Sequence, residues 1–97
     1  MKVLFKVNDL KKQLRGMRIS YYASFSGSHT VITVNNVSRV DRSETLVLIG
    51  TNVWGKESKI YINELWLDEM LRNGSKRLAY ELEGCALYDE YKILKVA

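Results

Sequence analysis

The chain has 97 residues, of which 46% are hydrophobic and 27% are charged, and it contains no proline. A chain of this length supports one hydrophobic core and this composition excludes a disordered chain, so we expect residues 1–97 to form a single globular domain. The formal net charge is +4, and it is concentrated in residues 1–50, where eight Lys or Arg stand against three Asp or Glu.

The apolar runs of the sequence are short. The N-terminal segment has only Val3, Leu4 and Phe5 before the next lysine, whereas a secretory signal needs roughly 7–15 apolar residues and a membrane span about 20. A single cysteine, Cys85, cannot form an internal disulfide, which fits a reducing compartment. We therefore expect a cytoplasmic protein that does not enter a membrane.

The N-terminal region predicts a short strand followed by a helix. Residues 2–7 are interpreted as the strand, Asn8 as the helix N-cap and residues 9–15 as the helix. A single longer helix competes with this interpretation, because heptad-like spacing relates Val3, Val7, Leu10, Leu14 and Met17. We favour a strand and then a helix, since one long helix would place Leu4 and Phe5 on its polar side.

Two strands are predicted next. Residues 18–25 alternate between apolar and polar side chains, which is typical of a half-exposed strand. A turn at 26–28 leads into a β-branched returning strand at 29–34. Asn35 and Asn36 indicate a turn or a bulge, after which residues 37–40 extend the strand.

Residues 45–50 contain the only four consecutive aliphatic residues in the chain, Leu46 to Ile49. A strand with one buried face alternates, so an unbroken aliphatic run predicts a strand covered on both faces. We interpret it as the central strand, paired with the strand predicted at 59–62.

The clearest helix is predicted at 64–72, between an N-cap at Asn63 and the helix-ending pair Asn73–Gly74. Helical spacing gathers one apolar arc from Trp66, Leu67, Met70 and Leu71. The opposite arc is formed by Glu64, Asp68, Glu69 and Arg72, with Leu65 lying among these charges.

The C-terminal residues predict strands. A helix at 76–83 would place basic residues at its positive end and acidic residues at its negative end, so the alternating pattern there is interpreted as a strand. A turn at Glu83–Gly84, a returning strand at 85–88 and a last strand at 92–96 follow.

These elements predict an α+β fold. We expect a mostly antiparallel sheet of about five to seven strands with two short helices, at about 9–15 and 64–72, packed on it. The alternative is a small all-β barrel in which the first helix is only a turn.

The sequence offers little for catalysis. Metal sites need several Cys or His ligands, and the chain has one of each, Cys85 and His29. No glycine-rich phosphate loop is present. We expect no metal and no cofactor, with His29 at the surface and Cys85 as a small buried thiol.

Four carboxylates fall near the last predicted hairpin, namely Glu81, Glu83, Asp89 and Glu90. Acid–base catalysis needs one carboxyl in an apolar pocket beside an ionised partner, whereas acids on an exposed hairpin form a hydrated negative face. We therefore expect a protein that is not an enzyme, and a small enzyme remains only a third hypothesis.

Trp54 stands in the polar loop at 51–58. Exposed aromatic residues often anchor protein interfaces, and the simpler alternative is that the indole folds back over an end of the sheet. Leu65 on the charged helix face and Tyr61 on the strand at 59–62 are further candidate contacts. An exposed sheet edge can also pair with a partner chain.

A second candidate surface is basic. Lys11, Lys12 and Arg15 share an arc of the first predicted helix, Arg18 lies near them, and Tyr22 is on the polar face of its strand. Clustered cations bind phosphates, and exposed aromatic rings stack on bases of single-stranded nucleic acid.

Our leading functional hypothesis is a small non-catalytic protein-binding module, such as a regulator, inhibitor or assembly subunit. It would contact a protein partner, or a second copy of itself, through Trp54, Tyr61, Leu65 and a sheet edge. The alternative is a nucleic-acid-binding domain that uses Lys11, Lys12, Arg15, Arg18 and Tyr22.

Overall fold

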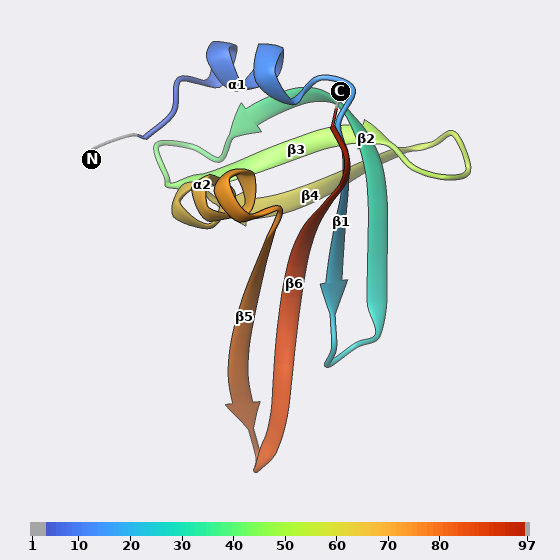
Figure 1. The fold of residues 1–97 in the computed structure, drawn as a ribbon, viewed down its shortest axis with the longest axis vertical. Coiled ribbons are helices and arrows are strands. Elements are labelled where there is room, and N and C mark those ends of the chain that lie inside the picture. The colour runs from blue at the N-terminus through green and yellow to red at the C-terminus, as the bar shows by residue number, and fades with distance from the viewer. Residues whose placement is uncertain (1–3, 97) are drawn as a thin grey trace.

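The computed structural model describes residues 4–96 and has an α+β fold (Figure 1). Six antiparallel strands form one open sheet in the order β4-β3-β2-β1-β6-β5, so the alternative of a closed barrel is wrong. Its elements are α1 (Val7–Leu14), β1 (Arg18–Ala23), β2 (Ser28–Arg39), β3 (Thr45–Thr51), β4 (Glu57–Asn63), α2 (Glu64–Asn73), β5 (Ser75–Leu82) and β6 (Cys85–Lys95).

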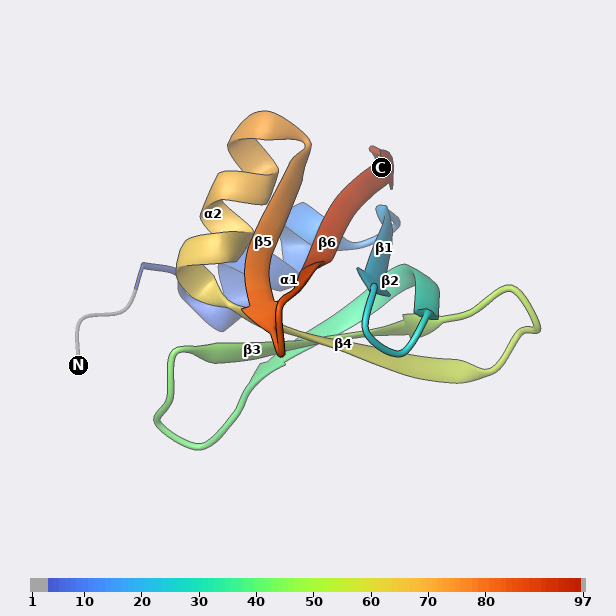
Figure 2. The ribbon, with the colours of Figure 1, turned by 90° about the horizontal axis from the view of Figure 1, so that it is seen from below.

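The sheet is sharply bent along β2. The pairing of β2 with β3 shifts register between Val34 and Asn36, which confirms the bulge expected at Asn35–Asn36. Figures 1 and 2 show the result: β3 and β4 run across the molecule, while β1, β5 and β6 run nearly at right angles to them. A bulge increases local twist, so a single long strand belongs to both parts of the sheet.

Both helices pack on one face of the sheet and enclose the core. Leu10 and Leu14 of α1 and Leu67 and Met70 of α2 are fully buried in it. The strands contribute Ile19, Ile32, Val34, Val37, Leu46, Leu48, Ile60, Ile62 and Tyr91. Successive side chains of a strand point to opposite faces of the sheet. Tyr21 of β1 packs against the core, so its neighbour Tyr22 lies on the opposite face.

The aliphatic strand is confirmed as β3, and it pairs with β4 as expected. Leu46, Val47 and Leu48 are all buried. The prediction of its central position is wrong, since β3 is second from the edge and the central strands are β2 and β1. An unbroken apolar run reports burial of both faces, and a strand next to an edge satisfies that condition equally well.

The N-terminal prediction is corrected. Helix α1 begins at Val7, and Leu4 to Lys6 form no strand; residues 2 and 3 of the predicted strand lie outside the described residues. Helix α1 also begins before the predicted cap at Asn8, with Lys6 in the N-cap position and no side-chain cap. It ends at Leu14, so the longer-helix alternative is wrong as well.

The second helix is confirmed, with one correction. Asn63 Oδ1 accepts a hydrogen bond from the Leu65 N–H at 2.9 Å, and Gly74 ends the helix with a left-handed φ of 84°. Glu64, expected on the exposed arc, is instead buried. Its carboxylate pairs with Arg39 at the end of β2 and accepts a hydrogen bond from the segment before α1.

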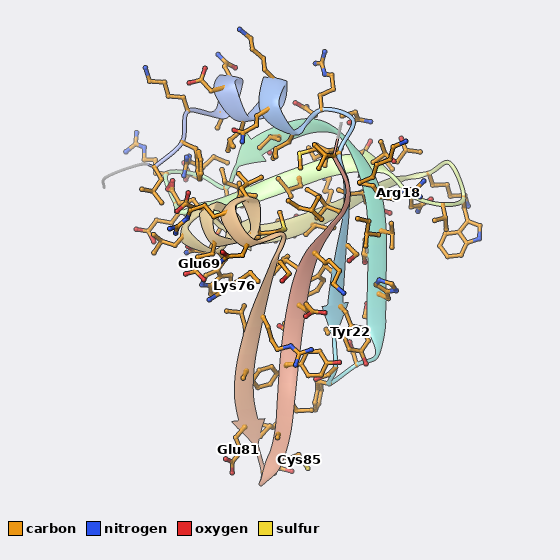
Figure 3. All side chains as sticks on the ribbon, viewed as in Figure 1. Arg18, Tyr22, Glu69, Lys76, Glu81 and Cys85 are labelled. Carbon is orange, nitrogen blue, oxygen red and sulfur yellow. The ribbon has the colours of Figure 1, made fainter. Side chains whose placement is uncertain are left out.

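The last two strands form a long hairpin that projects beyond the helices (Figure 1). The turn at Glu83–Gly84 is confirmed, with φ values of 50° and 80°. Strand β6 is continuous from Cys85 to Lys95, where two short strands were predicted. Cys85 is exposed rather than buried, because it closes the hairpin at the end that neither helix reaches (Figure 3).

Within residues 4–96, no helix combines the length and the apolar character that crossing a membrane requires.

Candidate protein-binding edge

Strand β4 forms one free edge of the sheet. The Glu64 N–H donates to the Glu44 carbonyl and the Asn52 N–H donates to the Lys56 carbonyl, at 2.9 and 2.8 Å. These bonds define both ends of the β3–β4 ladder. Hydrogen-bonded and non-hydrogen-bonded pairs alternate in an antiparallel ladder, so Glu57, Lys59 and Tyr61 turn their backbone N–H and C=O groups outward. Asn63, the N-cap of α2, also turns its N–H outward.

One of these outward groups already has a partner. The Tyr91 hydroxyl, from β6, donates to the Tyr61 carbonyl at 2.7 Å. Burial raises the pKa of Tyr91 well above its ordinary value of 10, and the nearby Tyr21 and Asp89 raise it further. The hydroxyl links the edge strand β4 to β6, the strand next to the opposite edge of the sheet, and leaves the backbone at Glu57 and Lys59 facing outward.

A groove of about 500 Å³ runs beside β4. Its walls combine the edge strand with aromatic side chains from three other elements: Tyr21 of β1, Trp66 of α2 and Tyr91 of β6. The Tyr21 and Tyr91 ring centroids are 4.8 Å apart, and those of Trp66 and Tyr91 are 6.4 Å apart. The volume suits a few side chains of a bound peptide.

The three candidate partner-binding residues follow this edge from end to end. Trp54 precedes β4 and is 80% exposed, Tyr61 lies within β4 and is 55% exposed, and Leu65 follows β4 in α2 and is 54% exposed. Figure 1 shows the β3–β4 loop and the start of α2 at opposite ends of the strand. Seven extended residues span about 20 Å, so a partner must cover the whole edge to contact all three.

The loop that carries Trp54 is well organised. Asn52 Oδ1 accepts hydrogen bonds from the N–H groups of Trp54 and Lys56, at 2.9 and 3.0 Å, while its Nδ2 donates to Ser58 Oγ at 2.9 Å. The alternative in which the indole covers the sheet is wrong. Trp54 borders a smaller pocket of about 300 Å³ shared with His29 and Val31 of β2.

The candidate nucleic-acid residues are divided between two faces of the sheet. Helix α1, which carries Lys11, Lys12 and Arg15, packs on the core face through Leu10 and Leu14. Arg18 and Tyr22 lie on the opposite face, because they alternate along β1 with Ile19 and Tyr21, which face the core. The expected single surface is therefore not formed.

Tyr22 instead belongs to an aromatic cluster that the sequence did not predict. Its ring centroid is 5.6 Å from that of Tyr88 and 6.2 Å from that of His29. The Arg77 guanidinium lies 4.2 Å from the Tyr88 ring centroid, and Glu90 Oε2 lies 3.4 Å from Arg77 Nε. His29 is exposed, as expected.

The four hairpin carboxylates do not act as one group. Asp89 accepts hydrogen bonds from the hydroxyls of Tyr21 and Tyr80, at 3.1 and 3.5 Å. Burial raises the pKa of Tyr21, and this hydrogen bond to Asp89 adds to the rise. Glu81 and Glu83 are exposed. Within residues 4–96, no three His, Cys, Asp or Glu side chains are placed to hold a metal ion.

Two residues important for the site were missed in the sequence. Tyr91 could have been found if the alternation of residues 85–95 had been followed through one strand, because Tyr91 and Ile93 then point to the same face. The buried Glu64 carried no such signal, since its environment depends on residues distant in the chain.

No protein-family model, curated protein or solved structure matches this chain.

Proposed function

We propose that the protein is a non-catalytic protein-binding module that receives an extended segment of its partner along β4. One observation carries the proposal: three large, exposed side chains, Trp54, Tyr61 and Leu65, follow a strand whose outward backbone groups are available at Glu57 and Lys59. Strand addition at a sheet edge draws affinity from backbone hydrogen bonds and specificity from side-chain pockets. The adjoining aromatic groove supplies such a pocket.

The partner would bind mainly through the aromatic residues. Buried aromatic side chains dominate protein interfaces, where their loss costs about 2 kcal/mol or more, a thirtyfold change in affinity. Lys56 and Lys59 outnumber Glu57 along the edge, which favours a segment that carries acidic residues. A regulator, an inhibitor or an assembly subunit would each use such a surface.

Affinity capture with matched variants tests this proposal. Wild-type protein, Trp54→Ala, Tyr61→Ala and Phe25→Ala are immobilised and exposed to extract of the source cells. Phe25 is a suitable control, because it is 68% exposed and lies in the β1–β2 turn rather than along β4. We expect a protein that wild type and Phe25→Ala retain and that both β4-edge variants lose, with all four melting temperatures alike. Equal retention by all four would contradict the proposal.

A second candidate function, nucleic-acid binding, is favoured by the cluster of Tyr22, His29 and Tyr88, which the Arg77 guanidinium contacts, with Arg18 farther along β1. Aromatic rings on a sheet face stack on bases, and surrounding cations bind phosphates. Fluorescence anisotropy with a labelled mixed-sequence single strand tests it. We expect Tyr22→Ala to weaken binding about tenfold and Arg18→Ala to reduce the salt slope by about 1. No binding by the wild type at low salt would remove this candidate.

A further inference from the structure

The opposite free edge of the sheet, formed by β5, has a hydrogen-bonding pattern that the backbone determines. The Ile93 N–H donates to the Gly74 carbonyl at 2.8 Å, which sets the alternation of the β5–β6 ladder. The pairs Lys76–Tyr91 and Leu78–Asp89 then exchange hydrogen bonds within the hairpin. The same alternation continues along the hairpin, so Arg77, Ala79 and Glu81 turn their N–H and C=O groups outward.

The available part of this edge begins at Arg77. Helix α2 packs against the first residues of β5, where Lys76 Nζ lies 2.6 Å from Glu69 Oε2. Figure 3 shows this pair beside the helix and Glu81 near the far end of the hairpin, beyond α2. Ala79, Tyr80 and Glu81 are all exposed. An exposed edge of this kind is a template for another strand.

The outward-facing residues of β5 are self-complementary when the strand is reversed. Along the strand these residues are basic, small and acidic. When a second copy of β5 pairs antiparallel with Ala79 opposite Ala79, Arg77 of each copy lies opposite Glu81 of the other, so the two-fold axis gives this pair twice. Registers centred on Arg77 or on Glu81 would place like charges directly opposite each other, which is destabilising. Registers centred on Leu78 or Tyr80 would place Ala79 opposite Arg77 or Glu81, so the register centred on Ala79 is the one that forms two Arg77–Glu81 pairs.

The side chains on the other face of the hairpin agree with this register. Leu78 of one copy would face Tyr80 of the second copy, and the symmetry again gives the contact twice. Leu78 is half-buried, and Tyr80 is 40% exposed. Aromatic and aliphatic cross-strand pairs stabilise antiparallel strands.

Arg77 has contacts on β6, the neighbouring strand, and retains exposed surface for a second partner. Its Nε lies 3.4 Å from Glu90 Oε2 and its guanidinium lies over Tyr88, while its side chain remains 58% exposed. A guanidinium has five N–H donors, so the Glu90 contact leaves donors for a second carboxylate. Because Tyr88 and Glu90 belong to β6, the Arg77 side chain turns toward the β5 edge when it meets Glu81 of the second copy.

We propose that two copies of the chain associate through β5, antiparallel about Ala79, so that their sheets become continuous. The symmetry is isologous, as in most homodimers. An edge of about five residues buries less than a standard interface, and such contacts are weak. The dimer therefore forms at roughly micromolar to millimolar concentrations. The β4 edge remains accessible in it, because β4 and β5 are opposite edges of the sheet.

Charge reversal tests the register by sedimentation velocity over a range of protein concentrations. Arg77→Glu leaves two acidic residues on the edge and Glu81→Arg leaves two basic ones, so each should weaken self-association at least about tenfold. An equimolar mixture of the two variants should form a heterodimer about as strong as the wild-type dimer. The mixture also excludes misfolding as the cause, since an unfolded variant would not be rescued. Lys12→Glu on α1 is the matched control and should not change the association.

The double variant Arg77→Glu with Glu81→Arg sharpens the test. It restores opposite charges in the same register, so it should pair with itself but not with the wild type. Ala79→Pro removes an outward N–H, which an edge strand tolerates, and should abolish association while Ala79→Ser preserves it.

A wild-type protein that stays monomeric up to about 1 mM, the weak limit of specific affinities, would overturn the proposal. Association that survives both Arg77→Glu and Ala79→Pro would also overturn it. So would association that is lost in Trp54→Ala or Tyr61→Ala, because β4 would then be the dimer surface. Trp54→Ala and Tyr61→Ala should leave self-association through β5 unchanged. A failure of the dimer proposal is therefore distinguishable from a failure of the proposed partner binding at β4.

Discussion

Glu64 and Arg39 form a buried ion pair, with Arg39 Nη1 3.2 Å from Glu64 Oε2. The Arg39 side chain is 15% exposed and the Glu64 side chain is 2% exposed. The pair also holds the segment before α1. Glu64 Oε1 accepts from the Leu4 N–H at 2.9 Å, and Arg39 Nη2 donates to the Phe5 carbonyl at 3.0 Å. Side chains of α2 and β2 thus satisfy backbone groups that a strand ladder would otherwise bind.

Removing the Glu64 carboxylate should destabilise the protein strongly. Glu64→Ala leaves Arg39 as an uncompensated charge in a nearly buried position, and breaking such a pair costs about 3–5 kcal/mol. Urea unfolding followed by circular dichroism measures the loss. Glu57→Ala, on the exposed face of β4, should change the free energy of unfolding by less than about 0.5 kcal/mol. Similar small values for both variants would show that the ion pair contributes little.

Tyr91 should make the stability fall at alkaline pH. The pKa of its hydroxyl is about 10 in an unfolded chain and is raised in the folded protein by burial. The unfolded state therefore loses this proton first, so the contribution of Tyr91 is complete below pH 10 and is lost as the pH rises through the folded-state pKa.

Tyr91→Phe provides the comparison. It should lower the free energy of unfolding near pH 7 by about 1 kcal/mol, because the hydrogen bond to the Tyr61 carbonyl is lost. It should also flatten the decline above pH 10, which denaturant unfolding at a series of pH values measures. Parallel wild-type and variant curves above pH 10 would mean that Tyr91 does not cause the decline.

Gly50 should tolerate no side chain. It pairs with Val34 beside the bulge in β2, and a Cβ there would overlap the backbone carbonyl of Thr33. Backbone atoms cannot move aside, so Gly50→Ala should cost about 3 kcal/mol, the upper end for overpacking.

Gly55→Ala is the control for this substitution. Gly55 has a φ of 77° and open space around it, so alanine there should cost only the backbone strain of about 1 kcal/mol. Thermal unfolding of both variants gives the ranking. A smaller loss for Gly50→Ala would show that the bulge adjusts.

Cys85 should react as an accessible thiol in the folded protein. Its exposed position at the end of the β5–β6 hairpin means that reaction with a thiol reagent requires no unfolding. The reaction rate in native buffer should be within about tenfold of the rate in denaturant. A buried thiol, which reacts only after local opening, would be slowed by more than that. Full protection until unfolding would contradict the exposed position.

Local patterns in the sequence were sufficient for most of the secondary structure. Asn63 and Gly74 define α2 because capping and left-handed conformations depend on individual residue types. The bulge at Asn35–Asn36 and the strand identity of β5 were predicted from local residue preferences and charge order. The candidate contacts Trp54 and Leu65 were named from their polar surroundings, and both are exposed.

Long-range pairing decided the rest. The sequence by itself determined where the apolar faces lie, since a period of two or of 3.6 residues is a local property. Only the tertiary structure decided which strands form the edges, that Glu64 meets Arg39, and that Tyr91 reaches the Tyr61 carbonyl. These contacts join residues 25 or more positions apart, and side chains so distant are brought together by the arrangement of the strands in the sheet rather than by any pattern within a single element.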